Sequence, residues 1–272
     1  MIQIRDLSTT PLPVVVDCLL RAFEGYFVPM PKELHVWEQR FGRSGVDWSR
    51  SYGAFKEGEL VAFIIHAIGE LDGKRTAFNT GTGVVPEHRG KHLVDELYAH
   101  ALPELKRSGV DLCTLEVITK NVAAVRVYER LGFAAMHTWK SFLGEPKAND
   151  AGEPLQPREL HEVDLGDDRW YSWDHRVEAL TRSMGGFVVF TLGGAQPWGH
   201  VIADPNTGRV ARLAVNDEAD RDQWIRLISS LGTFQKPLRL VNVHPERTAL
   251  IEALLTSDLV NDIDQFEMRM TV

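Results

Sequence analysis

The sequence predicts an α/β chain of two tandem domains, each with a central mixed β-sheet flanked by helices. Its 272 residues exceed a typical single domain and are enough for two hydrophobic cores. Strand-like apolar runs joined by polar turns alternate with segments of helical apolar spacing. The order of these segments in the second half repeats much of the order in the first half, which indicates a duplication rather than a short-period solenoid.

The first half contains a continuous series of expected elements. Apolar alternation predicts the strands, apolar spacing of three and four residues predicts the helices, and two polar tetrapeptides predict tight turns within a three-stranded meander. In chain order the expected elements are a strand at 2–6, helices at 11–23 and 31–41, strands at 52–55, 60–68 and 76–85, a helix at 91–107, a strand at 112–117, a helix at 121–131 and a strand at 134–142.

A segment rich in proline, glycine and charge, residues 146–168, is interpreted as a linker. We therefore expect domains at 1–145 and 169–272. The elements expected after the linker are a helix at 170–184, strands at 187–191, 200–203 and 210–215, a helix at 220–231, a strand at 238–243, a helix at 246–256 and a strand at 263–270.

The composition limits the possible partners and compartment. Thirty Lys and Arg against 38 Asp and Glu give an acidic chain, with the surplus mainly after residue 145, so we expect neither nucleic acid nor an anionic membrane as a partner. Cys18 and Cys113 lie in unrelated segments and form neither a disulfide framework nor a thiolate metal site. No secretory leader or membrane-spanning run is visible. We expect a cytoplasmic protein, and a homo-oligomer is compatible with the sequence.

The most informative segment runs from Val84 to Leu93, with the sequence VVPEHRGKHL. A strand that enters a basic, glycine-containing turn and then opens a helix places unpaired N–H groups and the helix dipole at one point, where a pyrophosphate can bind. Further on come the motifs NVAA, beginning at Asn121, and YERLGF, beginning at Tyr128. These two residues are seven apart, close to two helical turns, so they share one helix face about 10 Å apart.

Together these motifs resemble the acyl-CoA site of the GCN5-related N-acetyltransferases, and the resemblance covers nearly all of residues 1–145. It implies acetyl-CoA as co-substrate, lying where the strands 76–85 and 112–117 splay apart. Backbone groups would cradle the pantetheine and pyrophosphate, with Arg89 and Lys91 adding positive charge. The residues implied to bind the cofactor are Gly83, Val84, Val85, Arg89, Gly90, Lys91, His92, Leu93, Asn121 and Ala124.

The turn departs from the family pattern at two positions. The family usually has glycine or alanine where this chain has His92 and Val94. Glycine is favoured there because it allows close backbone approach and a free φ, so the His92 side chain must point away from the phosphates or the turn must differ.

The resemblance also implies catalytic roles. Tyr128 would be the general acid that protonates the departing thiolate, because a phenol with an ordinary pKa of about 10 holds its proton at neutral pH. Glu116 would be the general base, directly or through water, with His66 and Glu24 as alternatives. The backbone N–H of Val84 would meet the developing oxyanion.

Several of these residues also have purely structural interpretations. Asn121 is a favourable helix N-cap, and Tyr128 on its own is a common core aromatic. His88 and His92 have the spacing of a zinc pair, but no third ligand is apparent, so we expect no metal. Tyr26 lies, with Phe27, Trp37 and Trp48, in the segment that helps to roof the acceptor cleft in the family, although core packing explains these rings equally well.

The second half lacks comparable signals. Residues 216–220, with the sequence NDEAD, present carboxylates where a pyrophosphate needs donors, and Ala253 aligns with Tyr128. We therefore expect a degenerate copy, with the first domain active.

The predicted function is transfer of an acetyl group to a primary amine, on a small molecule or a peptide, in a ternary complex without a covalent enzyme intermediate. One alternative is a non-catalytic protein that senses acyl-CoA or another ligand. A second is a peptide aminoacyltransferase, whose need for charged transfer RNA fits poorly with the acidic balance.

Overall fold

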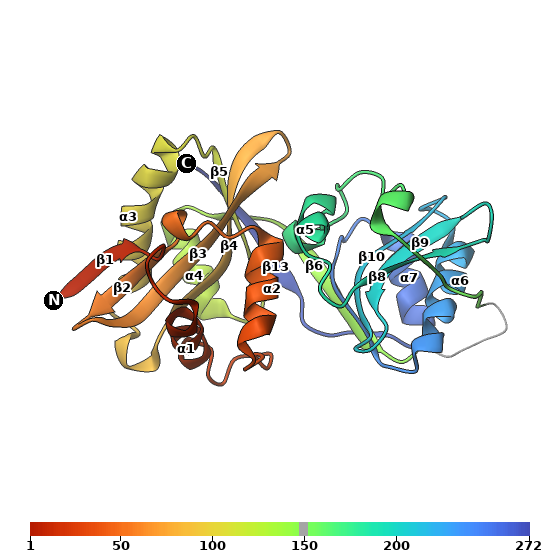
Figure 1. Ribbon diagram of the computed structural model, residues 1–272, viewed down its shortest axis with the longest axis horizontal. Coiled ribbons are helices and arrows are strands. Elements are labelled where there is room, and N and C mark those ends of the chain that lie inside the picture. Colours follow the sequence, from red (N-terminus) through yellow and green to blue (C-terminus); the bar gives the residue numbers. More distant parts are fainter. Residues whose placement is uncertain (147–151) are drawn as a thin grey trace. The chain divides into compact units, whose positions relative to one another are not determined.

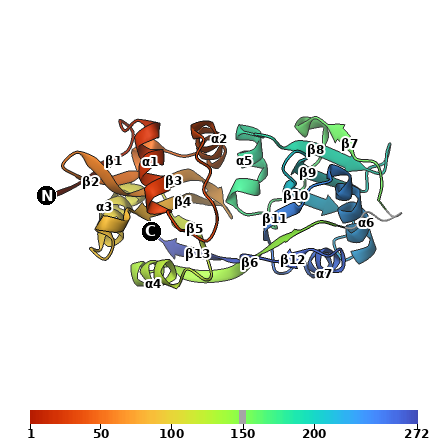
Figure 2. The same ribbon diagram turned by 90° about the horizontal axis from the view of Figure 1, so that it is seen from below.

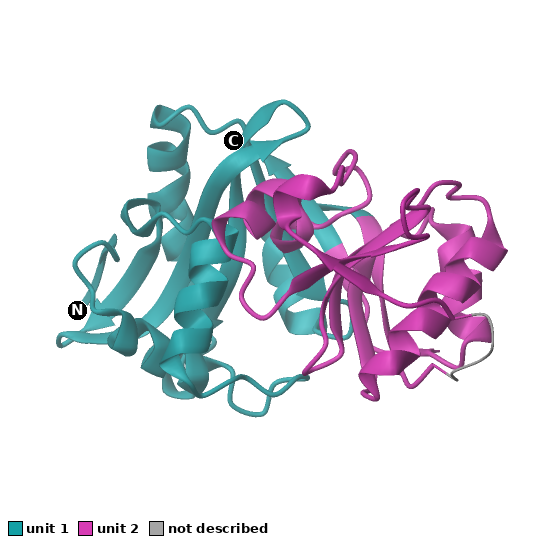
Figure 3. Ribbon diagram, turned by 45° about the vertical axis from the view of Figure 1, so that its right-hand side comes forward, with its two compact units in different colours: residues 1–136, 267–272 teal, residues 137–266 magenta. Residues whose placement is uncertain are grey.

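The computed structural model describes residues 1–146 and 152–272, and it confirms a mixed α/β fold (Figure 1). The chain divides into two compact units, which we call unit 1 (residues 1–136 and 267–272) and unit 2 (residues 137–266) (Figure 3). These limits differ from the expected boundaries at 145 and 169, since unit 2 begins at residue 137 and the last six residues of the chain return to unit 1. Residues 147–151 of the expected linker lie outside the described residues.

Unit 1 has the element order expected from the sequence. Its elements are β1 (Ile2–Asp6), α1 (Leu12–Ala22), α2 (Leu34–Ser44), β2 (Tyr52–Lys56), β3 (Glu59–Leu71), β4 (Lys74–Val84), α3 (Leu93–Arg107), β5 (Leu112–Ile118) and α4 (Val122–Leu131). Strand β6 (Ala134–Gly144) begins in unit 1 and continues in unit 2, and β13 (Gln265–Thr271) begins in unit 2 and ends in unit 1.

The sheet of unit 1 has the order β1-β2-β3-β4-β5-β13. The strands from β1 to β4 pair antiparallel, whereas β4 and β5 are parallel and are connected through α3. Helices α1 and α2 lie on one face of the sheet, and α3 and α4 lie on the other (Figure 2). The sheet is therefore covered on both faces, as its buried strand β3 requires.

Strands β4 and β5 diverge partway along their length. Their parallel pairing runs from Thr76↔Leu112 to Asn79↔Leu115, yet β4 continues to Val84 and β5 to Ile118. On the opposite side of β4, the register with β3 shifts at Thr80, which is the extra residue of a β-bulge. A bulge bends its strand, so it separates β4 from β5 at this point. We call the divergence beyond Asn79 and Leu115 the fork.

Unit 2 contains a second mixed sheet, in the order β6-β11-β10-β9-β8-β7, with β12 beside β6. The pair β10 and β11 is parallel and the other pairs are antiparallel. Its core includes Trp224, Leu227 and Leu250. The elements are β7 (Gln156–Arg158), α5 (Val177–Arg182), β8 (Val188–Leu192), β9 (Gly199–Asp204), β10 (Arg209–Val215), α6 (Arg221–Leu231), β11 (Leu238–Val243), α7 (Thr248–Thr256) and β12 (Val260–Asn261).

One expected element of this half was wrong. The helix expected at 170–184 is a short 3₁₀ turn at Trp173–His175 followed by α5. The buried guanidinium of Arg212 explains this, since it donates to the carbonyl oxygens of Leu165 (2.8 Å) and His175 (3.0 Å) and so fixes a non-helical path. The expected linker also contains a strand, β7, which pairs with β8.

Candidate active site

The turn after β4 contains two left-handed residues, Gly90 (φ 72°) and His92 (φ 56°). The His92 side chain is 74% exposed, and its Nδ1 lies 3.5 Å from the Asp95 carboxylate. His92 thus keeps the backbone conformation that favours glycine and directs its side chain into solvent. Helix α3 starts at Leu93, and its first intrahelical bond runs from the Glu96 N–H to the His92 carbonyl, so the preceding amides are available to an anion.

The two basic side chains of the turn bind backbone oxygens. Arg89 donates from Nε to the carbonyl of Val84 (3.3 Å) and from Nη2 to the carbonyl of Ala22 (3.1 Å). Lys91 donates from Nζ to the carbonyl of Glu87 (2.8 Å). Arg89 therefore connects the turn to the end of α1 and to β4.

Gly83 allows α1 to approach β4 closely. A Cβ at this position would lie 2.8 Å from the Cβ of Ala22 and 2.7 Å from the ring of Phe63. Only glycine fits without displacing the end of α1. The absence of a side chain thus brings the loop after α1 next to the fork.

The register of β3 with β4 decides which backbone groups face the fork. The Val85 N–H donates to the Val61 carbonyl (3.0 Å), and in an antiparallel pair the bonded residues alternate. Gly83 and Val85 therefore direct their backbone groups to β3, whereas Thr82 and Val84 direct theirs toward β5. The Arg89 side chain donates to the Val84 carbonyl. The Val84 N–H is therefore the backbone group of that residue that is available to a ligand.

Tyr128 is buried, and its ring packs edge to face against Phe133, with centroids 5.7 Å apart. Its hydroxyl is hydrogen-bonded with Thr82 and Asn79, the residues at the base of the fork. Burial raises the pKa of Tyr128 to about 12, although these hydrogen bonds oppose the shift. The phenol is therefore both a core aromatic and a protonated group at the fork.

Asn121 performs the N-cap role that its position predicts. Its Oδ1 accepts a hydrogen bond from the Ala124 N–H (3.2 Å) at the start of α4. The same side chain also hydrogen-bonds the hydroxyl of Tyr26, whose ring packs against Phe23 and Phe27 at 4.8 and 5.2 Å. Asn121 thus connects the loop between α1 and α2 to the helix that carries Tyr128.

The candidate bases differ in accessibility. Glu116 is half-buried and is the first β5 residue beyond the last β4–β5 pair. Glu24 is exposed in the loop after α1. His66 is fully buried, its Nδ1 lies 2.7 Å from the Arg50 carbonyl, and burial lowers its pKa to about 4. Of these three side chains, Glu116 is the one that the sheet places at the fork.

The described residues give little support for a cysteine nucleophile or a metal site. Cys18 and Cys113 are buried, and burial raises the pKa of each thiol to about 12, which makes them poor nucleophiles. Within the described residues, no three or more His, Cys, Asp or Glu side chains gather in a way that could hold a metal ion. None of the described helices is both long enough and apolar enough to cross a membrane.

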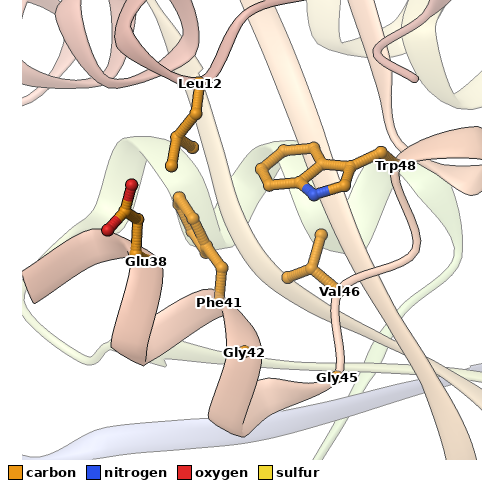
Figure 4. Close-up of a pocket in the computed structure, with 7 residues that line it drawn as sticks. All are labelled: Leu12, Glu38, Phe41, Gly42, Gly45, Val46 and Trp48. Atoms are coloured by element: carbon orange, nitrogen blue, oxygen red, sulfur yellow. The ribbon is translucent and has the colours of Figure 1, made fainter. Parts of the chain in front are cut away.

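A separate pocket of about 290 Å³ lies at the other end of α1, around Leu12, Phe41 and Trp48 (Figure 4). Leu12 is ten residues before Ala22, or about 15 Å along the helix axis. Because Ala22 is the residue that contacts Gly83, this pocket is distinct from the fork.

Sequence reasoning did not identify Asn79 and Thr82 as part of the site. The run Asn79-Thr80-Gly81-Thr82-Gly83 did carry a signal, since asparagine and glycine are depleted in strand interiors and often mark a bulge. That signal gives the position of the bulge but not its contact with a tyrosine 46 to 49 residues further along the chain.

Comparison with known proteins agrees with this arrangement. Residues 15–133 match the model of the acetyltransferase (GNAT) family. The ribosomal protein bS18-alanine N-acetyltransferase of Escherichia coli K12 is 30% identical over 134 residues, which are 49% of this chain and 81% of that protein.

Two solved structures share the fold over both units. A GCN5-related N-acetyltransferase from Sphaerobacter thermophilus has a TM-score of 0.68 at 12% identity, with coverage of 99% of this chain and 95% of that chain. A tandem GNAT protein from the clavulanic acid biosynthesis pathway has a TM-score of 0.66 at 12% identity, with coverage of 100% and 98%. The matched residues 15–133 include the fork, its turn and Tyr128. The chain therefore belongs to the GCN5-related N-acetyltransferase (GNAT) family and is an acyltransferase.

Proposed function

We propose that the protein transfers the acetyl group of acetyl-CoA to a primary amine, with unit 1 as the catalytic copy. The observation that carries this proposal is the position of the Tyr128 hydroxyl, which bonds Thr82 and Asn79 where β4 and β5 part. A fork between two parallel strands offers unpaired backbone groups on both sides, and a phenol at its base is placed to protonate a departing thiolate.

The residues around the fork fit acetyl-CoA. The open N–H of Val84 and the backbone of Thr82 would bond the pantetheine arm, and the free amides at the start of α3 would receive the pyrophosphate. Gly90 leaves open space beside the turn, since a Cβ there would meet nothing within 4 Å. Acetyl-CoA supplies an activated thioester, whose acyl carbon the amine attacks.

The proton transfers are assigned to two side chains. Glu116 accepts a proton from the attacking amine, directly or through water, and Tyr128 gives its proton to the sulfur as the carbon–sulfur bond breaks. The raised pKa of Tyr128 keeps the phenol protonated until the thiolate develops. A direct reaction without a covalent enzyme intermediate is favoured because both thiols are buried with a pKa of about 12.

For the acceptor we propose the α-amine of a peptide or protein N-terminus, with small-molecule amines as the other class. The support is the 30% identical relative, whose named acceptor is the alanine of ribosomal protein bS18. In this chain Tyr26 and the exposed Phe27 present aromatic rings on the loop beside Asn121. Such rings suit a flexible peptide better than a compact ion.

The test measures thiol release from acetyl-CoA on a panel of alanyl peptides and small amines. Tyr128→Phe is expected to lower kcat by about 10² or more. Tyr52→Phe is the matched control, because Tyr52 is also buried but lies on β2 against His100. The proposal fails if Tyr128→Phe keeps the wild-type kcat on an accepted amine.

A sensor that binds acyl-CoA without turnover is the second candidate. The observation that favours it is the presence of His92 and Val94 at the usual small positions of the turn. Heat of acetyl-CoA binding without thiol release on any amine would favour the sensor. Retention of a protonated phenol at the fork favours the enzyme.

A further inference from the structure

Asn79 is the centre of a buried hydrogen-bond network at the base of the fork. Its side chain is buried. The Nδ2 group donates to the Thr82 hydroxyl (2.7 Å) and to the Tyr98 hydroxyl (2.7 Å). Its Oδ1 accepts the Gly81 N–H (3.0 Å), which fixes the bulge. One amide therefore shapes the strand and also orients two hydroxyl groups next to it.

The general acid proposed above joins this network. The Tyr128 hydroxyl bonds the side chains of Thr82 and Asn79, and its ring shares Phe133 with Tyr98, each pair of centroids being 5.7 Å apart. The rings come from different helices, Tyr98 from α3 and Tyr128 from α4.

Outside the network, a surface ion pair joins the same two helices. Arg130 makes two hydrogen bonds with the Asp95 carboxylate, at 2.8 and 2.7 Å. A bidentate pair fixes relative orientation as well as distance. The ion pair thus holds α3 and α4 together, while packing holds the Tyr128 ring and the side chains of Thr82 and Asn79 hold its oxygen.

We propose that Thr82 and Asn79 are positioning residues for the acyl transfer: they hold the Tyr128 hydroxyl at the fork, and the Thr82 hydroxyl, oriented by Asn79, stabilises the phenol oxygen after the proton has left. This inference rests on the proposed role of Tyr128 as general acid. Neither side chain touches the reacting atoms, and both act through the phenol.

The chemistry of the step explains why the phenol needs such partners. When the carbon–sulfur bond breaks, its electron pair goes to sulfur, the O–H bond of Tyr128 breaks, and an S–H bond forms. The negative charge then resides on the buried phenolate oxygen, which regains a proton from solvent after the thiol has departed. An unpaired charge in such a place is expensive, whereas donors aimed at the oxygen lower the cost.

The roles of the two residues differ. The Thr82 hydroxyl accepts from Asn79, so its own hydrogen is available to the two phenol oxygens that it contacts, those of Tyr98 and Tyr128. Asn79 polarises that hydroxyl and also maintains the bulge. A change at Thr82 therefore removes this donor and one acceptor of Asn79 but leaves the Asn79–Gly81 bond of the bulge in place, whereas a change at Asn79 also alters the fork.

The test is a double-mutant cycle between Thr82→Val and Tyr128→Phe. Valine keeps the shape of threonine and removes the hydroxyl. In the wild-type background Thr82→Val should lower kcat about tenfold with a KM for acetyl-CoA within about twofold, because only the reacting state needs the donor. In the Tyr128→Phe background the same change should leave kcat within about twofold.

Thr76→Val is the matched control. Thr76 is a buried threonine on the same strand, and its hydroxyl makes one hydrogen bond, to the Lys74 carbonyl (2.9 Å). Its loss should affect stability but leave kcat unchanged in both backgrounds. Thr82→Ser, which restores the hydroxyl, should recover most of the lost kcat.

A second cycle needs no substrate. The urea unfolding free energies of the same four proteins should be non-additive for Thr82→Val and Tyr128→Phe, because the two side chains share a hydrogen bond. Additive effects in unfolding, or a tenfold loss that persists in the Tyr128→Phe background, would overturn the positioning role. If Tyr128→Phe itself keeps full kcat, the proposed acid fails first, so the two failures are distinguishable.

Discussion

Asn121 in unit 1 and Arg247 in unit 2 hold the same place in their folds, each being the residue before the helix that follows the second of two parallel strands. Their side chains behave differently. Asn121 caps its own helix, whereas the guanidinium of Arg247 donates to the Leu213 carbonyl on β10 (2.8 Å) and binds Glu218. The Tyr171 hydroxyl donates to the same carbonyl (2.8 Å). The divergence of β10 and β11 is thus filled by side chains of unit 2.

The first prediction is that the protein binds one molecule of acetyl-CoA per chain. In unit 2 the side chains of Arg247 and Tyr171 lie at the Leu213 carbonyl of β10, and the following residues 216–220 carry three carboxylates. Titration calorimetry should give a stoichiometry near one, and the heat should disappear with changes at the turn of unit 1. Two bound molecules would contradict this assignment.

The second prediction concerns the stability that Arg247 provides to unit 2. Its side chain is 3% exposed, and its removal leaves Glu218 and the Leu213 carbonyl without this partner. Arg247→Ala should therefore lower the free energy of unfolding by about 3 kcal/mol. The control is Arg221→Ala, whose 4.0 Å contact with Glu252 is exposed and should cost less than about 0.5 kcal/mol. Equal losses of unfolding free energy in urea denaturation would show that burial of the ion pair does not determine its contribution to stability.

The third prediction contrasts two glycines on β4. Gly83→Ala places a methyl group against Ala22 and Phe63, neither of which can move aside cheaply, so it should cost about 1–3 kcal/mol. Gly81→Ala meets only the Phe63 ring at 3.8 Å, an ordinary contact, and should be neutral or slightly stabilising. The free energies of unfolding of the two variants, measured by chemical denaturation, test this prediction. If both variants unfold alike, close approach of α1 is not what requires Gly83.

These comparisons also show what the sequence could and could not predict. The turn at residues 84–93 and the tyrosine of α4 were recognisable because their spacing along the chain is the spacing of the motif. The strand order of unit 1 was not recognisable, because β13 comes from the far end of the chain to lie beside β5. Local sequence patterns do not show which distant strand pairs with the edge of a sheet.

The wrong helix at 170–184 has a similar physical origin. Apolar spacing there does suggest a helix, but the His175 carbonyl, which such a helix would use internally, accepts a hydrogen bond from Arg212. A buried guanidinium needs several acceptors, and Arg212 obtains one of them from this segment and the others from Leu165, Asp167 and Asp168 just before it. Tertiary hydrogen bonding therefore overrides the local preference. The contact of Asn79 with Tyr98 was invisible in the sequence for the same reason.

The fourth prediction is that His92→Gly stabilises the protein. His92 has a φ of 56°, which costs a residue with a side chain about 1 kcal/mol, and its imidazole is exposed, with Nδ1 3.5 Å from the Asp95 carboxylate. Glycine should raise the free energy of unfolding by up to about 1 kcal/mol and leave the affinity for acetyl-CoA equal or tighter. The matched substitution His92→Ala retains the strain and should not stabilise. Stabilisation by alanine equal to that by glycine would exclude backbone strain as the cause.

The fifth prediction is a loss of stability in mild acid. Burial lowers the pKa of His66 to about 4, whereas an unfolded histidine takes up its proton near pH 6.5. Between these values the unfolded state binds more protons than the folded state, so stability must fall as the pH drops through 6.5 and must level off below 4. For His66 the loss at pH 5 amounts to about 2 kcal/mol relative to pH 8.

Urea unfolding of wild type and His66→Gln at pH 8 and pH 5 measures this contribution. Glutamine can still donate to the Arg50 carbonyl, which the His66 Nδ1 approaches at 2.7 Å, but it has no proton to gain. The difference between the two pH values should therefore shrink in His66→Gln and persist in the control His35→Gln, whose side chain is exposed. Burial also lowers the pKa of His200 and His244 to about 4, so His66→Gln should remove only part of the dependence. An unchanged pH dependence in His66→Gln would mean that the buried imidazole is not the group that titrates.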